Sequence, residues 1–470
     1  MSMVQPVTTL PLSVPTEDEA VYIDALLSRL SLYEASNALK VAYYEGEQRV
    51  QMLGIAIPPE LQRLETVVGW PGTTVDVLEE RLDWYGWTSD GLDFGLEEIY
   101  TDNALGVDSG LGHLDALIYG TSFAVVGSGE GDEPSPLITL HSPRHMTGIY
   151  SSRTRRLKAA LSVLAEDGQI LEVTLYMPDE TTVFARPRQG GPWTVEDRDR
   201  HNLGRVPVVQ FVNRPRASRI TGRSEISNAV RYYTDAAVRT MLGMEINREF
   251  YSAPQRYALG VDQSDFVSAD GTTRTGWETI MGRVWAIGRD EDGNLPEVGQ
   301  FTPSSPAPYL EQVKGLAQLL AAEAAIPPSY LGFQTDNPAS ADAIQRSEAR
   351  LVKRAERRQQ SFGRAWIEVA RLALLIRDGE VPDDFRLVTA KWRDAATPTR
   401  SAAADEATKL VGAGILPADS TVTWDRIGLT PAEQRQVAAD KRRQAGSGVL
   451  EVLRASATTQ VNDAGSFTAP

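Results

Sequence analysis

The stretch PAPYLEQVKGLAQLLAAEAAIPPSYLGFQTDNPASADAIQRSEARLVKRAERRQQSFGRAWIEVARLALLIRDG, residues 306–379, predicts a helix, a loop and a second helix. The first helix is expected over residues 308–325 and the loop over 326–339, where proline and glycine interrupt the pattern. The second helix is expected over 340–377, capped by Ser340 and stopped by Gly379. At 1.5 Å per residue it would be about 55 Å long, which few globular proteins need.

Apolar residues of the second helix recur at helical spacing and form one stripe. The stripe is thin in its first half and dense in its second half, so we expect the second half to pack in a core and the first half to be more exposed. Its members are Ile344, Leu351, Ala355, Phe362, Trp366, Val369, Ala373 and Ile376.

The same helix is basic although the chain carries a net charge of −16. A charge run on a helix is usually a solvated face or an ion-pair partner for another chain, and the alternative is direct contact with DNA. The residues concerned are Arg346, Arg350, Lys353, Arg354, Arg357 and Arg358.

Composition limits the class of protein. A chain of 470 residues is too long for one core, so several sub-domains are expected. The sequence has no cysteine and therefore no disulfide or thiolate site. No apolar run is long enough for a membrane span and no secretory signal precedes the first helix. A pI near 4.9 argues against a protein that coats nucleic acid.

Motifs for catalysis or metal binding are missing from the sequence. There is no phosphate-binding loop of the ATPase type, and the glycines of residues 127–131 are followed by acids and prolines, as in a turn. His141 and His145 flank a loop without a third ligand, and the acids at 290 and 292 lack the glycine of a calcium loop. We therefore expect no cofactor, no metal and no enzymatic activity.

The rest of the chain predicts an α+β fold. Period-2 strands over 137–212 indicate an antiparallel sheet, and short strands over 255–305 lie between the helix expected at 223–250 and that at 308–325. Further expectations are a helix at 73–86, a strand at 384–392, a helix at 397–411 and a capped helix at 430–444.

The order of these parts resembles the portal proteins of tailed bacteriophages, in the branch found in long-tailed phages of actinobacteria. The resemblance covers residues 35–415, and the ordered set of segments carries it. The segments are ALIYGTSFAVVG (116–127), VPVVQFVNRP (206–215), GRSEI (222–226), DAAVRT (235–240), APQRYALG (253–260), IPPSYLGF (326–333), NPASADAIQRSEARL (337–351) and FGRAWIEVARL (362–372).

The resemblance implies a portal fold in a homo-oligomeric ring, of about twelve copies, around a DNA channel. Its expected parts are a wing over 1–222, a first stem helix over 223–253, a clip over 254–305, a second stem helix over 306–325, a tunnel loop over 326–339, a spine helix with a wing return strand over 340–396, a crown over 397–455 and a flexible tail over 456–470.

The function implied by the resemblance is structural. Such a ring would sit at one capsid vertex of the virion, assembled in the host cytoplasm, and form the channel for packaging and ejection of double-stranded DNA. The implied partners are the large terminase subunit, a head-completion or adaptor protein, the major capsid protein and the scaffolding protein, with no membrane. The alternatives are another head–tail adaptor, which would form no large ring, and a DNA-packaging enzyme, which would hydrolyse ATP.

Three groups of residues are expected to carry this function. The acidic chain favours weak, sliding contact with DNA, and a loop tip without Lys or Arg suits steric guidance, so the basic helix face is assigned to contacts between subunits. The loop tip is Gln334, Thr335, Asp336 and Asn337, and the clip docking surface is Arg274, Trp277, Asp290 and Asp292.

Overall fold

The computed structural model describes residues 15–48, 66–252 except 90, 168 and 189, and then 256–259, 297–300, 302, 305–333, 341–430 and 432–444. Helices and antiparallel strands both occur, which confirms the α+β class. The chain forms two compact units. Unit 1 comprises Met1–Leu78, Leu114–Phe123 and His141–Leu351, and unit 2 comprises Glu79–His113, Ala124–Leu140 and Val352–Pro470.

The helices and strands are distributed between these units as follows. Unit 1 holds α1 (Glu17–Tyr44), α2 (Trp70–Glu79, apart from its last residue), β4 (Met146–Ser151), β5 (Arg156–Glu166), β6 (Gln169–Tyr176), β7 (Thr181–Ala185), β8 (Thr194–Asp199), β9 (Val208–Val212), α5 (Asn228–Ser252), β10 (Arg256–Leu259), β11 (Glu297–Gln300), α7 (Ala307–Ala324) and the 3-10 helix η3 (Pro328–Leu331). Unit 2 holds β1 (Trp84–Thr88), α3 (Leu96–Asp102), the 3-10 helix η4 (Asp383–Leu387), β12 (Thr389–Trp392), α9 (Arg400–Gly412) and α10 (Thr421–Arg426). Besides α2, whose last residue lies in unit 2, four of the described elements have residues in both units, namely α4 (Leu105–Tyr119), β2 (Thr121–Gly127), β3 (Leu137–His141) and α8 (Ala341–Asp378).

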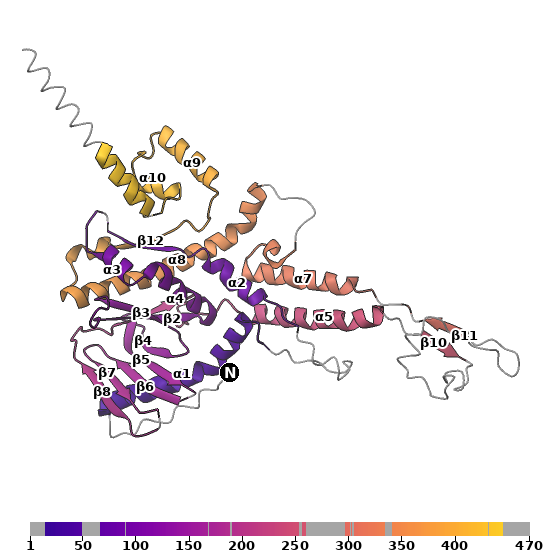
Figure 1. The fold of residues 1–470 in the computed structure, drawn as a ribbon, viewed down its shortest axis with the longest axis horizontal. Coiled ribbons are helices and arrows are strands. Elements are labelled where there is room, and N and C mark those ends of the chain that lie inside the picture. Colours follow the sequence, from indigo (N-terminus) through magenta and orange to yellow (C-terminus); the bar gives the residue numbers. More distant parts are fainter. Residues whose placement is uncertain are drawn as a thin grey trace, which may run out of the picture. The chain divides into compact units, whose positions relative to one another are not determined.

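A five-stranded antiparallel sheet in the order β4-β5-β6-β7-β8 lies in unit 1 (Figure 1), as the period-2 pattern predicts. Helix α1 packs on it, and its buried residues Ile23, Leu26 and Leu27 share a core with Phe184 and other strand residues. Alternation places one side of each strand against the helix, so the apolar faces of helix and sheet cover one another.

A buried carboxylate also ties α1 to this sheet. Glu19 completes a capping box with Thr16 at the start of the helix. Its Oε1 accepts a hydrogen bond from Thr182 Oγ1 at 2.9 Å and lies 3.0 Å from Arg198 Nη1. Burial opposes the charged form of Glu19, but hydrogen bonds from Thr16, Arg198 and Thr182 outweigh it and lower the pKa.

Helices α5 and α7 form an antiparallel pair in unit 1 (Figure 1). Ser227, just before α5, donates from Oγ to Glu323 Oε1 at 3.4 Å, near the end of α7. At the other end, a Cβ added to Gly243 would lie 3.2 Å from the Tyr309 ring, so a glycine permits the close approach. Strand β10 follows α5 and pairs antiparallel with β11, which precedes α7. The described part of 255–305 is therefore a β element at the tip of a helical hairpin, in agreement with the short strands expected between the two helices.

The core of unit 2 forms where α8 meets the two-stranded antiparallel sheet of β1 and β12. The Trp366 indole on α8 stacks on that of Trp84, and Trp87 Nε1 donates to Trp366 O at 2.9 Å. At Gly363 an added Cβ would lie 3.1 Å from Trp392 Nε1, so the absence of a side chain here allows the helix to lie close to β12.

The burial of α8 confirms the expected division of the long helix. Leu351, Ala355, Phe362, Trp366, Val369 and Ala373 are all fully buried. Arg346 and Arg350 in the first half are exposed, and Gly379 with φ +77° follows the last residue of the helix. Ile344 and Ser340 belong to the residues whose side chains the structure leaves undescribed.

Some predicted boundaries are wrong. The helix expected at 73–86 ends at Glu79, and strand β1 begins at Trp84. The strand expected at 384–392 is the 3-10 helix η4 followed by β12. The helix expected at 430–444 is confirmed over its described residues, with Glu433 N donating to Thr430 Oγ1 at 3.3 Å and Thr430 N donating to Glu433 Oε2 at 2.8 Å.

Candidate channel and subunit-contact surfaces

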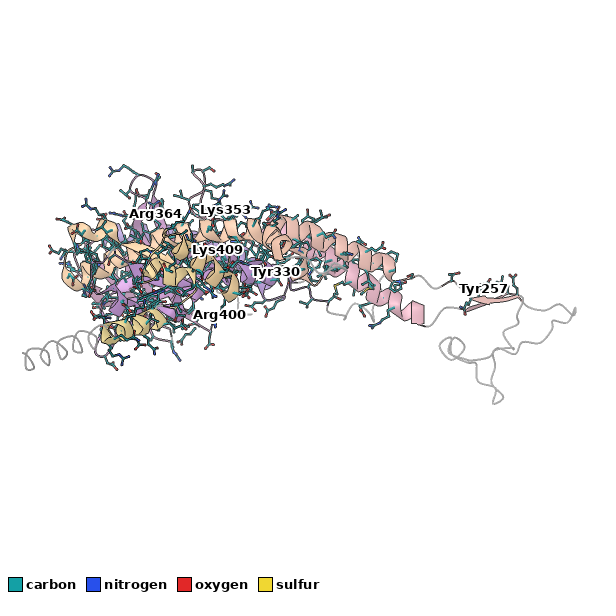
Figure 2. All side chains as sticks on the ribbon, turned by 90° about the horizontal axis from the view of Figure 1, so that it is seen from above. Tyr257, Tyr330, Lys353, Arg364, Arg400 and Lys409 are labelled. Atoms are coloured by element: carbon teal, nitrogen blue, oxygen red, sulfur yellow. The ribbon has the colours of Figure 1, made fainter. Side chains whose placement is uncertain are left out.

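The basic residues of α8 divide by exposure. Arg346, Arg350, Lys353 and Arg357 are exposed, and Arg354 is half-buried. Lys353 Nζ lies 2.6 Å from Glu356 Oε2, and in Figure 2 Lys353 and Arg364 both lie along one outer edge of the helix. An exposed pair of this kind contributes about 0–1 kcal/mol, so these side chains can exchange partners at little cost.

Arg358 does not belong to this exposed surface. Its side chain is buried, at 5% exposure, and its Nη1 donates to Arg354 O at 3.2 Å within the same helix. A guanidinium in that position stabilises its own chain and is not accessible to a neighbouring subunit. Helical spacing could have shown this, because Arg358 lies three residues after Ala355 and four before Phe362, on the buried stripe, whereas Arg357 does not.

The chain leading into the expected tunnel loop is held against the first turns of α8. The hydroxyl of Tyr330 in η3 donates to the Glu348 carboxylate. Arg350 Nη1 lies 3.5 Å from Ala322 O in the last turn of α7, where a cation complements the helix dipole. These contacts within unit 1 bring residues 322–330 next to 348–350.

Two groups of predicted site residues lie outside the described residues. They are the loop tip, Gln334, Thr335, Asp336 and Asn337, and the clip docking surface, Arg274, Trp277, Asp290 and Asp292. Both groups stay predictions.

The GRSEI segment, residues 222–226, fastens the start of α5 to its surroundings in unit 1. Gly222 has φ +75°, and a Cβ there would lie 2.1 Å from Gly120 O. Glu225 N donates to Leu117 O at 2.9 Å, and the buried Glu225 carboxylate accepts from Asn213 Nδ2 at 3.0 Å. This segment is one of those that carry the family resemblance in the sequence. Its structural role, to hold the start of α5 in place, depends on contacts with residues about 100 positions earlier in the chain.

His113 is a packing residue of unit 2. It is fully buried, stacks on Phe362 with ring centroids 5.1 Å apart, and accepts a hydrogen bond on Nε2 from Trp366 Nε1 at 2.9 Å. Burial lowers the pKa of His113 to about 3, so the ring is neutral at physiological pH. A neutral acceptor ring inside an aromatic cluster stabilises the packing of α4 on α8.

Two absences hold for the part of the chain that the structure describes. Among these residues there is no group of three or more His, Asp or Glu side chains that could hold a metal ion. None of the described helices is both long and apolar enough to cross a membrane.

Comparisons with known proteins agree with the resemblance in the sequence. The family model described as "Phage portal protein, SPP1 Gp6-like" matches residues 31–446. The chain is 33% identical to the portal protein of Mycobacterium phage D29, over 92% of this chain and 90% of the relative. It is 34% identical to the portal protein of Mycobacterium phage L5, over 85% of this chain and 83% of the relative. The chain therefore belongs to the SPP1 Gp6-like family of phage portal proteins.

Two solved structures are more distantly similar. They are chains from the neck of an empty GTA particle computed with C6 symmetry and the neck of a native GTA particle computed with C12 symmetry. The first has a TM-score of 0.44 at 14% identity, covering 81% of this chain and 95% of that chain. The second has a TM-score of 0.38 at 14% identity, covering 77% and 92%. Likenesses this weak establish neither an interface nor a symmetry for this chain.

Membership of the family assigns the function. The chain is a structural component of the phage virion and forms the capsid portal used for DNA packaging.

Proposed function

We propose that the chain acts as a ring of about twelve copies around a central DNA channel, and that it has no catalytic activity of its own. The observation that carries this proposal is the α5–α7 hairpin with the β10–β11 element at its tip, followed in sequence by a loop and the 38-residue helix α8. An antiparallel hairpin can line a channel, and a long helix offers a surface for head-to-tail contacts.

The parts are assigned as the sequence suggests. Residues 1–222 form the wing, 223–253 and 306–325 the stem, 254–305 the clip, 326–339 the tunnel loop, 340–396 the spine and return strand, 397–455 the crown and 456–470 a flexible tail. The α5–α7 pairing supports the stem, and the helices α9 and α10 support a helical crown.

The exposed cations of α8 supply contacts between neighbouring copies. A ring interface is heterologous, so a basic surface on one copy can face an acidic surface on the next. With a net charge of −16 per chain, acidic surface is abundant, whereas a channel wall that bound phosphate strongly would retard the DNA. Arg346, Arg350, Lys353 and Arg357 fit this role, and Arg354 fits it in part.

The partners follow from the position in the virion. The ring would dock the large terminase subunit, and later a head-completion or adaptor protein, on the clip, and would meet the major capsid and scaffolding proteins through the wing during assembly in the host cytoplasm. The motor would supply all ATP hydrolysis.

Electron microscopy of the purified full chain tests the proposal. We expect rings with a central hole and near twelve-fold symmetry, and no ATPase activity above that of a buffer blank. A monomer or dimer at micromolar concentration would favour a different head–tail adaptor, and ATP hydrolysis that copurifies with the chain would favour a packaging enzyme.

A further inference from the structure

A cavity of about 440 Å³ in unit 1 is lined by positive side chains from three segments of the chain. The segments are residues 29–40 of α1, residues 219–224 and the first turn of α5. Among the residues that the structure describes, no Asp or Glu lines the cavity. Its cationic residues are Arg29, Lys40, Arg219, Arg223 and Arg231.

Two carboxylates near the cavity in sequence, Asp235 and Glu225, are engaged elsewhere. Asp235, one turn after Arg231 on α5, accepts hydrogen bonds from the Tyr43 hydroxyl at 2.8 and 2.9 Å. Glu225 is buried beneath the GRSEI segment, with Asn213 Nδ2 and Arg214 Nη1 as partners. Among the described residues, the wall of the cavity therefore offers no negative charge to its cations.

Lys40 shows the consequence of this arrangement. Its Nζ donates to two neutral oxygens, Asn37 Oδ1 at 3.1 Å and Tyr119 O at 2.9 Å. Burial, together with the positive charges of Arg219 and Arg231, lowers the pKa of Lys40 to about 8. An anion in the cavity would remove the electrostatic cost that these like charges impose.

Arg231 offers donors toward the same space. Its Nη2 donates to Asn228 Oδ1 at 2.6 Å, and its guanidinium lies 5.7 Å from the centre of the Tyr43 ring. Its Nε is buried and has no hydrogen-bond partner among the described residues. A buried N–H without a partner is costly, and an oxygen acceptor from a ligand would offset that cost.

We propose that this cavity binds a multiply charged phosphate anion. One carboxylate would leave most of the positive charge uncompensated, whereas a diphosphate or triphosphate group carries several negative charges and matches the planar donors of Arg. The cavity has the size of a small-molecule site and is larger than inorganic phosphate requires. Leu30, Tyr33 and Phe123 add an apolar wall for an organic part of the ligand. The proposal is independent of the ring, because every residue belongs to one unit of one chain.

Isothermal titration calorimetry of the full chain at pH 8 tests the site, with pyrophosphate and ATP as probes and, separately, a duplex of about 20 base pairs. We expect Lys40→Gln and Arg231→Gln each to weaken pyrophosphate binding at least tenfold. The matched controls are Lys158→Gln and Arg153→Gln, which neutralise exposed cations of the same unit outside the cavity and should leave affinity within twofold.

Proton uptake gives a second readout that general charge loss would not reproduce. Because a bound anion raises the pKa of Lys40 from about 8, binding at pH 8 should take up a fraction of a proton. The measured enthalpy should then differ between Tris and HEPES for the native chain and not for Lys40→Gln.

The relative affinities of the three probes identify the source of the phosphate group. Tighter binding of pyrophosphate or ATP than of the duplex identifies a free phosphate compound as the ligand, and the reverse order identifies a nucleic-acid backbone. Equal affinity of the native chain and both cavity variants overturns the proposal, as does absence of binding by all three probes. If a cavity variant fails to fold, Arg219→Gln at the exposed rim replaces it, with an expected loss of at least threefold.

Discussion

The indole of Trp366 stacks on the indole of Trp84 with ring centroids 3.9 Å apart and planes 11° apart. Both rings are almost completely buried, at 0% and 3% exposure. Trp87 and Tyr100 pack edge-on against Trp84, so four aromatic side chains meet where α8 crosses β1. The second half of α8, where the apolar stripe is dense, is therefore held in unit 2 by this aromatic cluster.

Replacing Trp366 tests how much this cluster stabilises unit 2. We expect Trp366→Ala to lower the free energy of unfolding by about 3–5 kcal/mol, because it leaves a cavity and removes the hydrogen bond to His113. Urea titration followed by circular dichroism measures the loss. Arg364→Ala, an exposed position on the same helix, is the control and should change stability by less than about 0.5 kcal/mol. Equal effects of the two substitutions would contradict the packing described here.

We expect His113 to contribute to the loss of folding stability at low pH. Its pKa is lowered to about 3 in the folded chain, against 6.5 for the free side chain, so the unfolded state binds the proton more readily. This stabilising contribution is complete above pH 6.5 and is lost as the pH falls toward 3. For each additional proton that the unfolded state binds relative to the folded state, the free energy of unfolding changes by about 1.4 kcal/mol per pH unit.

The measurement compares the native chain with His113→Gln, which keeps an acceptor for Trp366. As the pH is lowered from about 6.5 to about 4, the free energy of unfolding should fall more steeply for the native chain than for His113→Gln. Protonation of the carboxylates lowers the free energy of unfolding equally in both proteins. Parallel curves would show that His113 is not the buried neutral group proposed.

Two glycines allow backbone strain to be separated from crowding. Gly222 and Gly190 both have positive φ, +75° and +81°, but only at Gly222 would a Cβ strike a neighbour, Gly120 O at 2.1 Å. Gly190→Ala should cost about 1 kcal/mol. Gly222→Ala should cost several times as much, about 3 kcal/mol or more, since the start of α5 must shift. Thermal melts of both variants measure the difference, and similar melting temperatures would refute the close approach.

Removing charges on α8 distinguishes the arginines proposed to contact a neighbouring subunit from the arginine that is buried within its own chain. We expect the double variant Arg346→Gln, Arg350→Gln to weaken ring formation, with rings dissociating at lower salt than native rings, while leaving the stability of the single chain almost unchanged. Arg358→Gln should instead destabilise the single chain by about 1–3 kcal/mol, because its guanidinium is buried. Native mass spectrometry across a salt series, paired with urea titration, reports both effects. If Arg346 and Arg350 lie outside the interface, the ring population of the double variant will match the native one.

Shortening the expected tunnel loop tests its role as a valve or guide. Deletion of residues 333–337 should leave ring assembly intact, because Tyr330 and Glu348 still hold the entry segment against α8. Packaging or retention of DNA should fall, since the steric element would no longer reach the channel. Nuclease protection of DNA in particles assembled with the deleted chain measures this, and unchanged protection would exclude the loop from the function.

Local patterns in the sequence were enough to predict the long helix, its two-part burial, the antiparallel sheet and the helical hairpin. Each depends on periodicity or capping within one segment, such as the stripe from Leu351 to Ala373 or the capping box of Thr430 and Glu433. The strand at Trp84–Thr88 was missed because its partner, β12, lies about 300 residues later and its aromatic residues fit a helix pattern equally well.

The candidate sites were less predictable for the same reason. Sequence spacing identified a basic helix, and the apolar stripe of the same helix contains the position of Arg358 between Ala355 and Phe362, but the group was selected by charge alone and so included this buried residue. The cationic cavity gave no sequence signal at all. Its members come from α1, the 219–224 segment and α5, and only the fold brings Lys40 beside Arg231.

The aromatic cluster of unit 2 has a consequence for synthesis of the chain on the ribosome. Trp84 is made early, but Trp366 follows only after most of unit 1 has been translated, which takes on the order of tens of seconds at bacterial rates. Throughout that interval β1 lacks both β12 and α8, and the face of Trp84 that Trp366 later covers is without that partner. A nascent portal chain therefore finishes its second core late, and until then it depends on whatever keeps neighbouring nascent chains from associating through that face of Trp84.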